Sequence, residues 1–217
     1  MKTLKYIALG VMLTSLLFCS LSFSPPKKSY AQAETLEFYE TYTQQEVISK
    51  LDPKDTFFSW VHLHETYPES SKIGTCNEVD LKHLWNYIQG EAFKSKFPND
   101  LIIAVGAEAN DQMISLYAIR KSAANDVFPS KQDIDKVSVR KTDHEENYSL
   151  YLSFSGSGAE KWATMTRKNK GKDIAILLEG KVIAAPRVQE EIKNGECSIS
   201  GKYTEVEINK FKAAFED

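Results

Sequence analysis

The spacing of apolar residues along the chain predicts short strands and helices that follow one another. Apolar and polar side chains alternate from residue 148 to 154, which is typical of a strand with one covered face. Residues 174–178 are continuously apolar, which indicates a strand covered on both faces. Ile208, Phe211 and Phe215 recur at three- and four-residue spacing and predict one buried stripe on a final helix.

From residue 101 onward, the same reasoning predicts a mixed arrangement of strands and helices. Strands are expected at residues 101–105, 113–119, 148–154, 174–178, 181–185 and 196–200. Helices are expected at capping boxes formed by Ser157–Glu160 and Thr204–Glu207, with a short helix at Glu190–Lys193. Glu179-Gly180 is expected to form a tight turn. This order predicts an α+β fold, a mixed β-sheet with helices packed mainly on one face.

Residues 34–98 are predicted to form a separate α+β segment. Thr43 and Glu46 make a capping box before a short helix. Residues 57–63 are aromatic and β-branched enough for a strand, and residues 65–75 have the composition of a loop. A longer helix follows, with an expected buried face of Leu81, Leu84, Trp85 and Ile88.

The first 33 residues have the pattern of a secretory signal peptide. Lys2 and Lys5 precede an uncharged apolar run at residues 7–23, and Ala31-Gln32-Ala33 offers a small-x-small cleavage site. Cys19 leaves a lipid anchor open as an alternative, and an uncleaved membrane anchor is another. We therefore expect a periplasmic or secreted protein. Its expected parts are a signal peptide at 1–33, an α+β segment at 34–98 and a second domain at 99–217.

The charge balance argues against one class of partner. The chain has 27 basic and 30 acidic residues, and residues 1–33 hold four of the basic residues and none of the acidic ones. The remainder carries a net charge of −7, which argues against nucleic-acid binding. No second apolar run is long enough to span a membrane, so membrane contact is expected only through an uncleaved N-terminal segment.

Two cysteines, Cys76 and Cys197, follow the expected cleavage site. In an oxidising compartment they can form a disulfide if their Cα atoms lie within about 7 Å of each other. The alternative is two separate buried thiols, and the sequence leaves both possibilities open.

The candidate chemical sites in the sequence are weak. Ser155-Gly156-Ser157-Gly158 opens a helix but lacks the lysine of a phosphate-binding loop, so helix capping explains it better. His62 and His64 point to one face of a predicted strand and would need a third metal ligand, for which His83, His144 or a carboxylate is available. The sequence has no nucleophile elbow, zinc-protease motif or nucleotide-binding loop. We therefore expect no enzyme activity and no cofactor.

The C-terminal half holds a set of ordered motifs: Gly158–Ala163, Thr166–Lys172, Ile174–Gly180, Ala185-Pro186, Ile192–Gly195 and Ile199–Thr204. In their order and spacing these motifs resemble the SecD family of protein-export membrane proteins, in its first periplasmic (head) domain. The resemblance covers roughly residues 95–217, and Glu179 departs from it because the family usually has aspartate there. The family-motif residues are interpreted as mostly structural: Gly158, Trp162, Thr166, Asn169, Gly171, Gly180, Pro186, Gly195 and Gly201.

The resemblance implies a role linked to protein export. SecD, with SecF, uses the proton gradient to help move exported chains, and its head domain is thought to contact the emerging chain. Proton coupling needs membrane helices that this sequence does not show, so the resemblance implies a non-enzymatic, polypeptide-binding accessory. Its expected partners are polypeptide or export-channel components. Two alternatives stay open: an envelope interaction protein that reuses the fold without an export role, and a metal protein centred on His62 and His64.

Overall fold

The computed structural model describes residues 36–63, 67–110, 112–123, 126–142 and 147–216. The predicted signal peptide at residues 1–33 and its alternatives lie outside these residues and stay predictions. Within the described ranges, none of the helices combines the length and apolar character needed to cross a bilayer.

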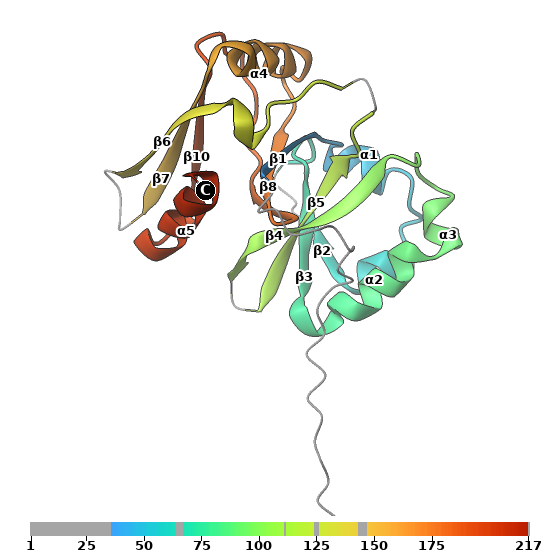
Figure 1. Cartoon of the computed structure of the whole chain (residues 1–217). Helices are drawn as coiled ribbons and strands as arrows, with labels where there is room; N and C mark the ends of the chain where they lie inside the picture. The colour runs from blue at the N-terminus through green and yellow to red at the C-terminus, as the bar shows by residue number, and fades with distance from the viewer. Residues whose placement is uncertain (1–35, 64–66, 111, 124–125, 143–146, 217) are drawn as a thin grey trace, which may run out of the picture. The chain divides into compact units, whose positions relative to one another are not determined.

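A seven-stranded mixed sheet contains strands from both halves of the chain (Figure 1). Its strand order is β1-β8-β9-β4-β5-β3-β2, and every neighbouring pair is antiparallel except β4 and β9. The strands are β1 (Leu36–Glu40), β2 (Val61–Leu63), β3 (Lys72–Asn77), β4 (Leu101–Asn110), β5 (Met113–Arg120), β8 (Ile174–Leu178) and β9 (Lys181–Ala184). Just after β1, Thr41 bridges Ile119 of β5, so the sheet curls until β1 also meets β5.

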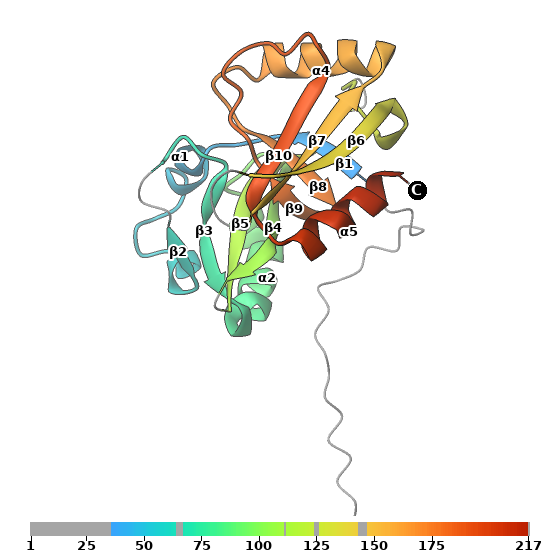
Figure 2. The same cartoon turned by 90° about the vertical axis from the view of Figure 1, so that its left-hand side faces the viewer.

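A second, three-stranded antiparallel sheet has the order β10-β7-β6 (Figure 2). Its strands are β6 (Ile134–Lys141), β7 (Tyr148–Phe154) and β10 (Glu196–Tyr203). Two helices contact this sheet, α4 (Gly156–Lys168) and α5 (Glu205–Glu216). The apolar side of β7 packs with β1, β8 and both helices into one core that includes Phe38, Leu150, Trp162, Ile176 and Ile208. Burial of these side chains joins the two sheets.

A second core lies under the N-terminal helices. The elements are α1 (Gln44–Ile48), α2 (Leu81–Gln89) and α3 (Glu91–Lys94), with short 3₁₀ turns at Thr56–Ser59, Glu78–Asp80 and Lys131–Asp133. Thr43 and Glu46 form the predicted capping box at α1. Leu81, Leu84 and Ile88 of α2 are buried as predicted, against the sheet strands and Phe57.

The α+β prediction with a mixed sheet is confirmed. The division into segments at residues 98 and 99 stays a prediction. Strands from before and after this point share one hydrogen-bonded sheet, in which β1 pairs with β8 and β3 pairs with β5.

Several local predictions were wrong. Residues 57–63 contain a 3₁₀ turn and a three-residue strand, because the Asp55 carboxylate caps Thr56–Ser59. Residues 65–75 include the start of β3.

Helix α4 begins at Gly156 after Ser155, so Ser157 lies inside the helix and does not cap it. Residues 190–193 are not helical, since the Ile192 N–H bonds to the Thr166 hydroxyl and not to a carbonyl one turn back. Strand β6 was not predicted.

Candidate functional site

Two motif glycines, Gly158 inside α4 and Gly195 just before β10, allow backbones to approach closely. A Cβ atom on Gly158 would lie 2.5 Å from the Cβ of Asp133 and 2.8 Å from its carbonyl oxygen. Gly195 has a φ of +69°, and a Cβ atom there would lie 2.8 Å from the Cβ of Ala159 and 2.9 Å from the carbonyl oxygen of Phe154. Only glycine avoids both the contacts and the backbone strain.

Three motif residues on α4 connect the helix to the segments beside it. The indole Nε1 of Trp162 donates a hydrogen bond of 2.9 Å to the carbonyl of Glu196 on β10. The hydroxyl of Thr166 donates to the Trp162 carbonyl at 2.8 Å and accepts from the Ile192 N–H at 3.0 Å. The buried amide of Asn169, at the C-terminal cap of α4, donates to the Met165 carbonyl at 2.9 Å and to the Glu40 carboxylate of β1 at 3.4 Å. These contacts give the residues structural roles, because each satisfies a buried polar group.

Three further motif residues, Gly171, Gly180 and Pro186, lie at turns or next to strand ends. Gly171 has a φ of +79° and its N–H donates to the Val188 carbonyl. Glu179 and Gly180, at φ values of +50° and +76°, form the hairpin between β8 and β9. The carbonyl of Pro186 accepts from the Ile174 N–H at 3.0 Å. Glycine suits the two-residue turn, while the positive φ at Glu179 explains why a glutamate is a poorer choice there.

A buried carboxylate, Asp133, joins the start of β6 to α4. It accepts hydrogen bonds from the Ser130 N–H at 2.8 Å, the Ser130 hydroxyl at 2.9 Å and the Lys161 ammonium at 2.7 Å. Burial alone would raise the pKa of the Asp133 carboxyl, but the bonds from Lys161 and Ser130 outweigh it and hold that pKa below its usual value. Asp133 is therefore charged in the folded protein at neutral pH.

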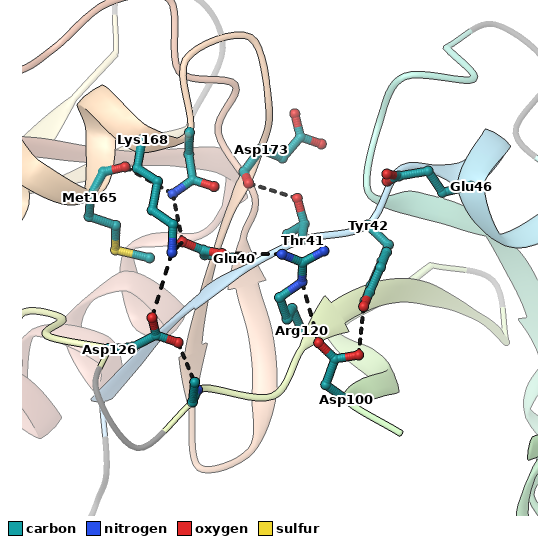
Figure 3. Close-up of polar contacts among 12 residues, drawn as sticks. Glu40, Thr41, Tyr42, Glu46, Asp100, Arg120, Asp126, Met165, Lys168 and Asp173 are labelled. Atoms are coloured by element: carbon teal, nitrogen blue, oxygen red, sulfur yellow. Dashed lines mark hydrogen bonds and ion pairs between the residues drawn. The ribbon is translucent and has the colours of Figure 1, made fainter. Parts of the chain in front are cut away.

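A chain of alternating charges, which we call the Glu40 cluster, crosses from α4 to β5 (Figure 3). The buried Glu40 carboxylate pairs with Lys168 of α4 at 2.6 Å and with Arg120 of β5 at 3.7 Å. Lys168 also faces Asp126 at 3.6 Å, and Arg120 faces Asp100 at 3.6 Å. The ion pair with Glu40 raises the pKa of Lys168. Asp126 lies in the segment that connects β5 to β6, and so connects the two sheets. Through Lys168, the cluster therefore links this segment to Glu40 at the end of β1.

The two residues that follow β1, Thr41 and Tyr42, add further polar contacts next to this cluster. The Tyr42 hydroxyl donates to Asp100 at 2.6 Å, while its ring lies 4.7 Å below the Arg120 guanidinium. Burial raises the pKa of Tyr42, and the bond to Asp100 adds to the effect. Thr41 donates to the Asp173 carbonyl at 2.7 Å, and the Asp173 carboxylate accepts from the Ser71 N–H at 2.7 Å. Polar contacts therefore flank the bridge between Thr41 and Ile119, where the end of β1 meets β5.

Replacing Glu40 by glutamine tests how much this cluster stabilises the fold. We expect the free energy of unfolding to fall by about 1–2 kcal/mol, because Arg120 and Lys168 are partly exposed and water replaces part of the lost attraction. The loss should shrink at high salt. Urea denaturation at two salt concentrations measures it. Lys168→Gln should act in the same direction, and Lys170→Gln, at an exposed neighbouring position, is the matched control; equal losses from both lysine variants would contradict this reading.

The alternative of a metal site at His62 and His64 is not tested by the described residues, because His64 lies outside them. His62 lies exposed on β2, His83 stacks against Trp60 with ring centroids 6.4 Å apart, and His64 and His144 lie outside the described residues. Among the described side chains, no three His, Cys, Asp or Glu residues are grouped as metal ligands.

The two cysteines are separate buried thiols in the structure. Cys76 packs in the core beneath α2, and Cys197 packs in the core between the sheets. Burial raises the pKa of Cys76 to about 11 and that of Cys197 to about 12. Thiols of this kind react slowly, since the thiolate is the reactive form.

An open cleft of about 360 Å³ lies where β9 and β4 come close to β10. Its walls are built largely from small residues: Gly106, Ser115, Ala184, Ala185, Ser200 and Gly201. The Tyr203 hydroxyl donates to the Ile183 carbonyl and ties the two walls together. The motifs Ala185-Pro186 and Ile199–Thr204 contribute residues to this cleft, Gly201 among them. Gly106 and Ser115 were missed, because a glycine and a serine in a strand pattern carry no chemical signal.

The fold and this cleft define a class of protein, an α+β domain with an open cleft beside strand edges. Residues 114–216 match the family described as SecDF, P1 head subdomain. This part of the chain is therefore similar to the SecDF P1 head, and all nine motif residues fall inside the matched range.

Curated relatives match short segments of the chain. A "Protein translocase subunit SecD" of Acidaminococcus fermentans is 52% identical over 50 residues, which are 23% of this chain and 12% of that protein. One from Sebaldella termitidis is 53% identical over 53 residues, covering 24% and 13% of the two chains. A structure described as "Structure and function of a membrane component SecDF that enhances protein export" covers 85% of this chain and 62% of that one, with 18% identity and a TM-score of 0.41. The matched segment is thus a small part of the SecD subunits.

Proposed function

We propose that the chain is a non-enzymatic accessory of protein export that works outside the cytoplasm and binds extended polypeptide. The match of residues 114–216 to the SecDF P1 head carries this proposal. The relatives are named as translocase subunits, and the signal peptide predicted at residues 1–33 supports a place outside the cytoplasm. The open cleft beside β10 supports a binding role, because small residues leave room for another backbone.

Photocrosslinking in living cells tests the proposal. A photoreactive amino acid at Lys202, an exposed residue of the cleft, should capture chains during export or components of the export channel. The same group at Lys94, an exposed residue of α3, is the matched control and should capture much less. Capture of one folded envelope protein, unchanged when export is blocked, would support the alternative of an envelope interaction protein and contradict an export role.

A further inference from the structure

We propose that the cleft binds its polypeptide through main-chain hydrogen bonds to the outer edge of β10, with little dependence on side-chain sequence. This inference rests on the proposed function, and it names the site and the mode of binding. Binding of this kind adds an extended segment to a sheet edge, where backbone groups supply the affinity.

Strand β10 ends the three-stranded sheet and has an edge available for pairing. Its inner edge pairs with β7 from Glu196 to Ser200. Within the described ranges no strand pairs with its outer edge. The pairing with β7 then slips between Ser200 and Tyr203, so Gly201 and Lys202 stand out of register beside the cleft. An edge with unpaired N–H and C=O groups is a template for another strand.

The opposite wall is also incompletely paired. Strands β4 and β9 meet in parallel at a single register pair, Gly106 with Val182. Strand β4 bulges there, since its pairing with β5 shifts between Val105 and Ala109. Bulges are frequent next to binding sites, because they interrupt a ladder and redirect the strand. The cleft therefore has irregular backbone on both walls.

The side chains in the cleft suit a backbone better than a bulky anchor. A Cβ atom on Gly106 would lie 3.1 Å from the Ser115 Cβ and 3.3 Å from the Tyr117 ring, so this wall has no room for a larger side chain at position 106. The volume of about 360 Å³ is at the small end of ligand sites, which suits a short stretch of chain. A deep apolar pocket, which would select one large side chain, is not what these residues form.

The charge of the cleft selects against one class of segment. Among the described residues that line the cleft, Lys202 is the one ionisable side chain apart from two tyrosines, and the others are aliphatic residues, serines and glycines. A lysine- or arginine-rich segment would meet a like charge there, and an acidic or neutral one would not. We expect extended, uncharged or acidic segments to bind better than basic ones.

Binding measurements on the full chain test the inference with a matched pair of variants. The probe is a fluorescent, unfolded peptide of Ser, Thr, Val and Glu, titrated by anisotropy. Ser200→Trp should fill the cleft and weaken binding about tenfold or more, which corresponds to about 1.4 kcal/mol. Ser198→Trp places the same group two residues away on the same strand, outside the cleft, and should leave affinity within about threefold of wild type. Thermal melting of both variants checks that they fold.

A second set of probes separates backbone pairing from side-chain capture. Scrambling the peptide should change affinity little, whereas N-methylation of alternate peptide bonds should weaken binding about tenfold, because it removes donors from one edge. Replacing Glu by Lys should also weaken it. Equal binding by wild type and Ser200→Trp, or no effect of N-methylation, would overturn the inference and leave the proposed function standing. Absence of binding by any unfolded probe would overturn the proposed function itself.

Discussion

Replacing Trp162 by alanine is expected to lower the free energy of unfolding by about 3–5 kcal/mol. The indole is 2% exposed and lies at the centre of the core between the sheets. Its ring centroid lies 5.6 Å from that of Phe38 on β1 and 5.5 Å from that of Phe154 on β7. Alanine would leave a cavity where these aromatic rings meet, and would also leave the Glu196 carbonyl without its indole donor.

Urea denaturation of the wild type and two variants measures this effect. Trp162→Phe keeps most of the apolar volume and removes the indole N–H, so it should cost clearly less than Trp162→Ala. The difference between the two variants reports the cavity. A loss below about 1 kcal/mol for Trp162→Ala would contradict a buried, structural role and would favour a binding role for this motif residue.

Acidification should destabilise the fold chiefly through carboxylates that are charged and hydrogen-bonded inside it. The pKa of Asp133 is held below its usual value, against the opposing effect of burial, by Lys161 and Ser130. Asp55 behaves in the same way: burial opposes the shift, and bonds from Lys96, Tyr87 and the Phe57 N–H lower its pKa. A carboxyl with a lowered folded pKa stabilises the protein above its unfolded pKa of about 3.9, and that stabilisation is lost as pH falls through the folded pKa.

Asp133→Asn isolates the contribution of Asp133 to this effect. We expect a loss of about 3 kcal/mol at neutral pH, because Lys161 loses its buried partner at the point where α4 begins. The variant should also show a weaker fall in stability below pH 4 than the wild type. Denaturation curves at several pH values measure both. Unchanged acid sensitivity in the variant would show that other groups dominate acid unfolding.

The sequence predicts strands well where both of their faces are buried, and helices well where a capping box marks their first turn. Residues 174–178 are all apolar because β8 is buried throughout, and the Thr204–Glu207 capping box marks the start of α5. Strand β6 escaped prediction because it is an edge strand with Asp135, Lys136, Arg140 and Lys141 exposed, so its apolar alternation is weak.

The candidate site could be predicted only in part. Motif glycines such as Gly195 were recognisable because backbone geometry requires them. The Glu40 cluster and the cleft were not, because they join residues far apart in the chain, and Glu40, Arg120 and Ser115 have ordinary local surroundings in the sequence. Only the pairing of β1 with β8 and the approach of β10 to β9 bring them together.

The central claim is that this protein recognises unfolded rather than folded polypeptide. The most direct test is to titrate the full chain with one reporter protein in two states, held folded by a tight ligand or kept unfolded by substitutions in its core. We expect saturable binding of the unfolded reporter, which the unfolded peptide probe inhibits, and no detectable binding of the folded reporter. Equal affinity for both states, or binding of the folded state alone, would contradict it.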